Sequence, residues 1–117
     1  MKNIDTTKPN WFTKEVKESW LADLKSGKFI QGYGALRYEK TYCCLGVLCV
    51  TLDKEYELIS ECGMSNGDSI YNLLGREIGD MRVDHLFRAN DRDYNNKHHK
   101  HDYSNVIPLI EQLPTKD

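Results

Sequence analysis

The chain has 117 residues with a formal net charge of −2, and 39% of its residues are hydrophobic and 29% charged. A chain of this length builds one modest core, so we expect a single domain over residues 1–117, with residues 1–9 flexible and residues 91–102 forming a surface loop. No apolar run approaches the roughly 20 residues of a membrane helix, and the polar start leaves no room for a secretion signal. We therefore expect a cytoplasmic protein without membrane partners, and the slightly acidic balance disfavours binding to long nucleic acid.

The clearest predicted helix lies near the N-terminus, within residues 10–29. Its apolar side chains recur at four-residue spacing, which is one stripe of an α-helix. Asn10 or Thr13 can cap its start, and Gly27 can end it in the left-handed conformation. The residues of the apolar stripe are Phe12, Val16, Trp20 and Leu24.

A short hairpin is expected next. The period-two pattern predicts a strand over residues 35–38, a polar turn at residues 39–40 and a return strand from Thr41. Gly32 and Gly34 precede it. These glycines either bend the chain or let the backbone approach an anionic ligand, with Arg37 as its charge partner.

The apolar stretch TYCCLGVLCV covers residues 41–50 and contains three of the four cysteines. We expect a strand through Cys44 and then a helix over residues 45–52, with Leu45, Leu48, Cys49 and Leu52 on its buried face. The spacing lacks the paired ligands typical of zinc sites. Burial as packing residues is therefore favoured over metal or redox chemistry for these cysteines.

Residues 53–69 are predicted to form a polar loop, with one short element near residues 56–59. Asp68 or Ser69 can then cap a short helix over residues 70–79.

The last third contains a short amphipathic turn over residues 83–87, a hydrophilic loop, and a final helix from near Ser104 to Leu113 with Pro108 in its first turn. Together these elements predict an α+β fold. It is a small single domain with an N-terminal helix, a short antiparallel hairpin or small sheet, and two or three further short helices.

Metal or acid–base chemistry has weaker support. One loop contains His98, His99, His101 and Asp102, but neighbouring lysines oppose a bound cation, so a solvated surface loop is favoured. Asp91 and Asp93 suit turn and capping roles as well as acid–base roles, and no local signature of a nucleophile is present. We expect no catalytic residue, no metal and no cofactor.

Binding has the better argument, because guanidinium groups suit phosphate and aromatic rings suit stacking on a base. On a net-acidic chain, a local basic and aromatic pocket favours a small anionic nucleotide, and we expect a homo-oligomer. Trp11 is equally compatible with a place in the core. The candidate ligand-binding residues are Gly32, Tyr33, Gly34, Arg37, Trp11, Arg88 and Arg92, and further rings are offered by Tyr38, Tyr42 and Tyr71.

Three segments resemble a family of small phage-encoded proteins. They are SWLADLKSGKFIQGYGALRYEKTYCCLGVLC, LFRANDRD and HDYSNVIPLIEQL. The chain differs from the family pattern at Val50 and Thr51, where an acidic residue is usual, and in a longer, histidine-rich loop after Asp91. The pattern falls on Trp20, Leu24, Ser26, Gly27, Gln31, Gly34, Leu36, Arg37, Cys43 to Cys49, Asn90 and Asp91.

The resemblance implies a viral accessory protein that acts in the cytoplasm of a bacterial host, and it supplies no catalytic motif. Because small phage accessory proteins often counter host defence, we expect a non-catalytic protein that sequesters a cyclic or NAD-derived nucleotide signal. One alternative is a protein–protein inhibitor of a host defence enzyme, with exposed aromatics such as Trp11 as anchors. The other is a metal-dependent nucleotide hydrolase that uses Asp91, Asp93 and the histidines.

Overall fold

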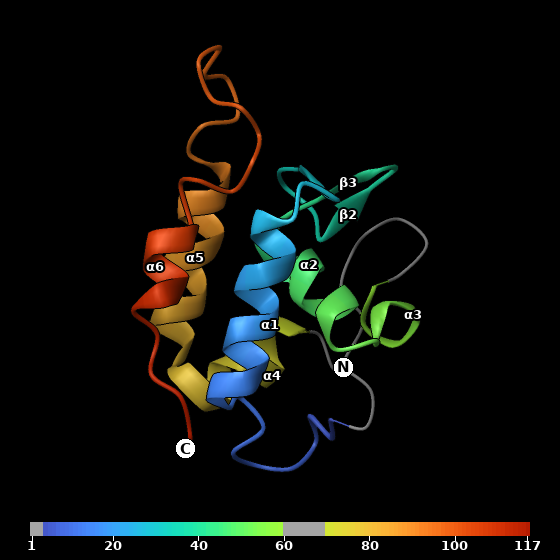
Figure 1. The fold of residues 1–117 in the computed structure, drawn as a ribbon, viewed down its shortest axis with the longest axis vertical. Coiled ribbons are helices and arrows are strands. Elements are labelled where there is room, and N and C mark those ends of the chain that lie inside the picture. Colours follow the sequence, from blue (N-terminus) through green and yellow to red (C-terminus); the bar gives the residue numbers. More distant parts are fainter. Residues whose placement is uncertain (1–3, 60–69) are drawn as a thin grey trace.

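The computed structural model describes residues 4–59 and 70–117, and within these ranges six helices and a three-stranded sheet form a small α+β domain (Figure 1). This confirms the predicted fold class. None of the described helices is long and apolar enough to cross a membrane. The helices are α1 (Lys14–Lys25), α2 (Cys44–Thr51), α3 (Glu55–Leu58), α4 (Ile70–Ile78), α5 (Asp80–Asp91) and α6 (Ile107–Glu111), and the strands are β1 (Ile30–Gln31), β2 (Arg37–Tyr38) and β3 (Thr41–Tyr42).

Helix α1 follows the prediction. The Thr13 hydroxyl accepts a hydrogen bond from the Val16 N–H at the start of the helix, and Gly27 takes a φ of +78° just beyond its end. Trp20 is fully buried on the predicted stripe, and its indole N–H donates to the Cys44 carbonyl oxygen at 2.9 Å. This bond joins α1 to the start of α2.

The predicted hairpin is present, since β2 pairs antiparallel with β3 and the turn passes through Glu39 at φ +53°. A third strand, β1, was not predicted. It pairs parallel with β3 and gives the order β1-β3-β2. A strand of two residues carries too short a pattern for period-two alternation to reveal it.

Helix α2 forms the centre of the core. It begins at Cys44 rather than Leu45, so the prediction that Cys44 lies in a strand is wrong; Cys43 is the extended residue before the helix. The predicted buried face is confirmed, but burial extends around almost the whole helix, because α1, α3, α4 and α5 all contact it. At Gly46 an added Cβ would overlap the carbonyl group of Leu36, so the close approach of helix and loop requires glycine.

Helix α5 corrects a second prediction. Residues 80–91 form one continuous helix, where a short turn and the start of a loop were expected. Only Val83, Leu86 and Asn90 of this helix are buried, and only two of these are apolar. The hydrophobic periodicity of the sequence therefore indicates a shorter helix than the one that forms. Gly79, at φ +96°, separates α5 from α4.

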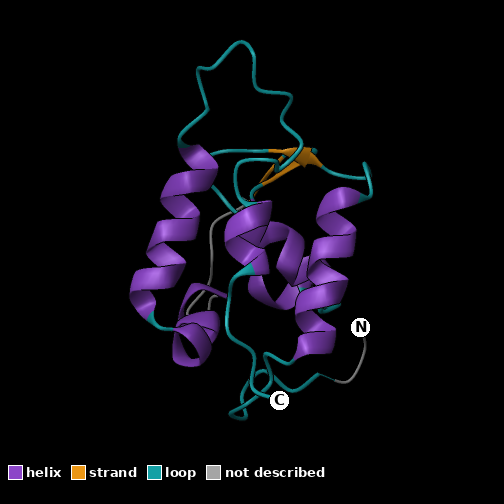
Figure 2. Cartoon of the chain, turned by 60° about the vertical axis from the view of Figure 1, so that its left-hand side comes forward, coloured by secondary structure: helices purple, strands orange, loops and turns teal. Residues whose placement is uncertain are grey.

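The final helix is shorter than predicted. Helix α6 begins at Ile107 rather than near Ser104, and Pro108 stands in its first turn as expected. The predicted Asp68 or Ser69 cap, and Cys62, lie outside the described residues. Figures 1 and 2 show the loop between α5 and α6 rising at the same end of the domain as the sheet.

Candidate binding site

An aromatic groove lies where the sheet meets the loop after α5. It has a volume of about 580 Å³, and we call it the tyrosine groove. Three large side chains on its wall, Ile30, Tyr38 and Tyr94, are 57%, 66% and 64% exposed. Exposed apolar groups that gather on one surface are typical of binding sites. The groove is lined by Ile30, Gln31, Gly32, Tyr33, Tyr38, Thr41, Tyr94 and His101.

The ring of Tyr33 joins the two walls of the tyrosine groove. It packs edge-on against Tyr94 and His101, with ring centroids 5.5 and 5.6 Å away. The Tyr33 hydroxyl and His101 Nδ1 are also hydrogen-bonded at 2.6 Å. Tyr33 therefore contacts the loop after α5 through both its ring and its hydroxyl group.

The loop wall is held in an unusual backbone conformation. His101 and Tyr103 have φ values of +54° and +67°, and a non-glycine residue in the left-handed region costs about 1–3 kcal/mol. Two bonds to Gln31 offset this cost. Its backbone N–H donates to the His101 carbonyl at 3.0 Å, and its side-chain Oε1 accepts the Tyr103 N–H at 2.8 Å.

A buried amide pair supports the groove from beneath. Gln31 and Asn90 are 2% and 0% exposed, and Gln31 Nε2 donates to Asn90 Oδ1 at 2.9 Å. Asn90 Nδ2 donates to the Gly32 carbonyl at 2.9 Å, and Asn90 Oδ1 accepts the Cys44 N–H at 3.1 Å. Every hydrogen-bonding atom of these side chains has a protein partner. The two amides therefore position the site and are not free to bind a ligand.

Three carboxylates lie near Tyr33, although none of them lines the tyrosine groove itself. Burial, followed by the charges of Asp93, Asp91 and Asp102, raises the pKa of Tyr33 to about 12. A hydrogen bond from Asn96 lowers the pKa of Asp93, and a serine hydroxyl two residues along the chain lowers that of Asp102. Asp93 is paired with Arg92, whereas Asp91 and Asp102 have no ion pair within the described residues, so the surroundings of Tyr33 favour a cationic group over a phosphate.

A second groove, of about 530 Å³, adjoins the first and shares Ile30 and His101 with it; we call it the lysine groove. Lys25 lies 3.6 Å from the Glu111 carboxylate, whereas Lys100 has no ion pair within the described parts of the chain. Lys100 therefore provides a positive charge in the lysine groove, which adjoins the tyrosine groove at Ile30. The lining residues are Leu24, Lys25, Gly27, Phe29, Ile30, Lys100, His101, Asp102, Ser104 and Ile107.

Of the Gly-x-Gly pair only Gly32 lines the tyrosine groove, and the local backbone geometry accounts for both glycines. A Cβ on Gly32 would lie 2.6 Å from Thr41 Oγ1, and the Gly32 N–H donates to the Tyr42 carbonyl at 2.8 Å. Gly34 takes a φ of +77°, and its N–H donates to Asp91 Oδ1 at 3.2 Å. The chain bends here beside a carboxylate, which does not favour a bound phosphate.

The arginines predicted to bind phosphate are all paired with carboxylates. None of them lines the tyrosine groove or the lysine groove as the structure describes these. The structure therefore does not bring them together with Gly32, Tyr33 and Gly34. The ion pairs are Arg37 with Glu55 at 2.6 Å, Arg88 with Asp84 at 2.9 Å, and Arg92 with Asp93 at 3.4 Å.

Trp11 is not an exposed anchor. It is 6% exposed and packs edge-on against Phe12, so the structure corrects this expectation in favour of a place in the core. The buried Glu77 carboxylate accepts the N–H groups of Asn10 at 3.1 Å and Phe12 at 2.7 Å and fixes this segment against α4. The segment precedes α1, whose start lies at the end of the domain away from the sheet (Figure 1).

The cysteines near the middle of the chain are core residues, as predicted. Cys43, Cys44 and Cys49 are fully buried free thiols, and burial raises the pKa of the Cys43 thiol to about 11. Within residues 4–59 and 70–117, no three His, Cys, Asp or Glu side chains are arranged to hold a metal ion.

A family model described as a domain of unknown function, DUF8296, matches residues 12–112. The chain belongs to the DUF8296 family. The match includes both walls of the tyrosine groove and all of the described helices of the DUF8296 domain. No curated protein and no solved structure matches this DUF8296 domain significantly.

Sequence reasoning did not select Ile30, Gln31, Thr41 or Tyr94 of the tyrosine groove in the DUF8296 domain as binding residues, and it considered His101 only for metal chemistry. Tyr94 lies in a stretch that is otherwise strongly hydrophilic. An isolated aromatic residue in a polar loop is the signal that would have drawn attention to it, since such a ring has little to pack against locally.

Proposed function

We propose that this DUF8296 domain is a non-enzymatic phage accessory protein that counters a bacterial defence by binding a host protein through the tyrosine groove. The observation that carries the proposal is the exposure of Ile30, Tyr38 and Tyr94 on one surface around Tyr33. Tyrosine is enriched in protein interfaces because it offers a large contact area at a low cost in conformational entropy. The phage setting is supported by the resemblance of the segments around residues 19–49 and 86–113.

The charges near the tyrosine groove indicate what kind of protein surface would bind there. Asp91 and Asp102 lie near Tyr33 and have no ion pair within the described residues, so a complementary surface carries arginine or lysine, whose side chains also pack well on tyrosine rings. Enzymes that bind nucleic acid present such basic surfaces. A host defence enzyme of that class is the partner that the groove fits best.

A second candidate is the capture of a small phosphate-bearing nucleotide, cyclic or NAD-derived. The specific observation in its favour is that the tyrosine groove and the lysine groove meet at Ile30 and His101. A base stacked on the tyrosines would place its phosphate toward Lys100. In this arrangement Lys100 takes the role that the sequence suggested for Arg37, whose charge is paired with Glu55.

Phage plating on a defence-bearing host that expresses the protein tests the proposal. Tyr38→Ala and Tyr94→Ala should each abolish the protection that the wild-type protein gives to the phage. Tyr56→Ala is the matched control, because Tyr56 is 96% exposed on α3 and lies outside both grooves. Full protection by both groove variants would refute the proposal.

The two candidates are separated by what the purified protein carries. Mass spectrometry of molecules released by heating should detect no nucleotide if the groove binds a protein. A released nucleotide whose amount falls with Lys100→Ala but not with Lys97→Ala would favour the second candidate, because Lys97 lies outside the lysine groove.

A further inference from the structure

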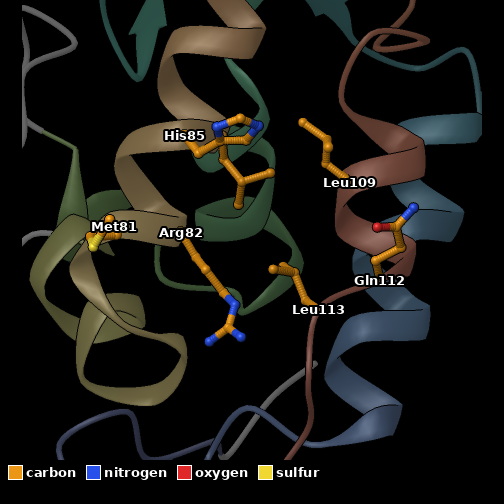
Figure 3. A pocket seen from close by; sticks show the side chains of 7 residues that line it. Met81, Arg82, His85, Leu109, Gln112 and Leu113 are labelled. Atoms are coloured by element: carbon orange, nitrogen blue, oxygen red, sulfur yellow. The ribbon is translucent and has the colours of Figure 1, made fainter.

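A separate groove lies between α5 and α6, and its volume is about 440 Å³. Figure 3 shows side chains of the two helices facing one another across it, with Arg82 and His85 on α5 and Leu109 and Leu113 near α6. None of its lining residues belongs to the tyrosine groove or the lysine groove. A volume of this size lies within the range of about 300–1,000 Å³ that is usual for ligand pockets.

The interior of this groove is apolar. Leu86 and Leu113 are 1% and 8% exposed and form part of the core, while Leu109 is half-buried and lines the same groove. Met81 stands at the rim with 88% of its surface exposed. Methionine adapts its shape to different partners, so this rim suits an apolar side chain inserted from outside.

Uncompensated positive charge lies beside the apolar interior. One N–H of the Arg82 guanidinium donates to the Ile78 carbonyl at 2.9 Å, and no carboxylate of the described residues pairs with Arg82. The Arg82 side chain and the exposed His85 ring both line the groove (Figure 3). By contrast, Arg88 on the same helix is paired with Asp84.

The charges select the kind of occupant. A second copy that docks with the same groove across a two-fold axis would bring no carboxylate to Arg82, since the residues that line the groove include no aspartate or glutamate. An occupant with apolar side chains and nearby carboxylates satisfies both the leucines and Arg82. We propose that the α5–α6 groove docks an acidic amphipathic helix of a partner protein, which inserts leucine-like side chains between Leu109 and Leu86 and places a carboxylate on Arg82.

Two synthetic helical peptides test this inference. They share the same leucine positions and differ only in having glutamate or lysine at the flanking positions, and binding is measured by fluorescence anisotropy with the full-length protein. The glutamate peptide should bind and the lysine peptide should not. Equal affinity for the two peptides, or no binding of the glutamate peptide, would overturn the proposal.

Variants locate the contact. Arg82→Gln should weaken binding of the glutamate peptide by about tenfold, whereas Arg82→Lys, which keeps a cation, should retain most of it. Arg76→Gln is the control, since it removes the same charge from α4 outside the groove. Tyr94→Ala should leave the affinity unchanged, so this site and the tyrosine groove succeed or fail independently. Arg82→Gln with wild-type affinity would exclude the proposed contact.

Sedimentation of the protein alone examines the other possible occupant. The protein should show no self-association that depends on this groove. A dimer that Leu109→Glu dissolves would overturn the proposal in favour of a second copy.

Discussion

Gln31 and Asn90 contact each other in the interior of the domain, with Gln31 Nε2 donating to Asn90 Oδ1 at 2.9 Å. Gln31 lies in the sheet and Asn90 in the last turn of α5, so this bond joins the two parts of the chain that form the tyrosine groove. Asn90 also accepts the Cys44 N–H at the start of α2. One carboxamide therefore ties the sheet, the central helix and α5 together beneath the proposed binding surface.

Asn90→Ala should destabilise the domain by about 3 kcal/mol, because it leaves the buried Gly32 carbonyl and Cys44 N–H without a partner and removes one bond of the Gln31 amide, which keeps its bond to Asn105. Urea unfolding followed by circular dichroism measures this loss. Asn72→Ala, at an exposed position of α4, should change the free energy of unfolding by about 0.5 kcal/mol or less. Equal effects of the two substitutions would contradict the structural role of Asn90.

Gly46→Ala should destabilise the domain by about 3 kcal/mol, since the new methyl group would overlap the backbone of Leu36, which cannot rotate away. Gly75→Ala in α4 is the comparison. There the methyl group would meet only the carboxylate end of the Asp80 side chain, which can move, so a change within about 1 kcal/mol is expected. Thermal unfolding of the two variants distinguishes backbone overlap from a general effect of alanine.

The sequence predicts the features that local patterns determine better than those that depend on contacts between distant residues. The α1 stripe, the buried cysteines and the first-turn place of Pro108 follow from local spacing and propensity. Strand β1 does not, because two residues pair with a partner beyond the hairpin and leave no periodic pattern. Ion-pair partners leave no pattern in the sequence either: an arginine beside two glycines suggests a phosphate site, whereas in the fold Arg37 pairs with Glu55, 18 residues away.

The buried thiols predict a pH dependence of stability. Burial raises the folded-state pKa of Cys43 to about 11, above the ordinary value of about 8.5, so its contribution to the free energy of unfolding is complete below pH ~8.5 and is lost as the pH rises toward 11.

Burial of the thiols also predicts their reactivity. At pH 8, alkylation mapped by mass spectrometry should leave Cys43, Cys44 and Cys49 unmodified in the native protein and modify all three in urea. Fast alkylation of these cysteines in the native protein would contradict their burial.

Arg37→Gln should lower stability rather than binding. It breaks the 2.6 Å contact with Glu55, whose carboxylate also accepts the Tyr42 hydroxyl at 2.8 Å, so the urea midpoint of unfolding should fall. Arg88→Gln, which removes an exposed ion pair on α5, should cost less. Loss of phage protection by folded Arg37→Gln protein would instead restore Arg37 to the binding site.

Photo-crosslinking in infected cells tests the central claim most directly. A photoreactive phenylalanine analogue replaces either Tyr94 or Tyr56. Both tyrosines are exposed, but Tyr94 lines the tyrosine groove and Tyr56 lies on α3 outside it. The tyrosine-groove account predicts a discrete adduct with one basic host protein from position 94 and none from position 56. The same adducts from both positions, or none from position 94 in cells that the protein protects, would contradict it.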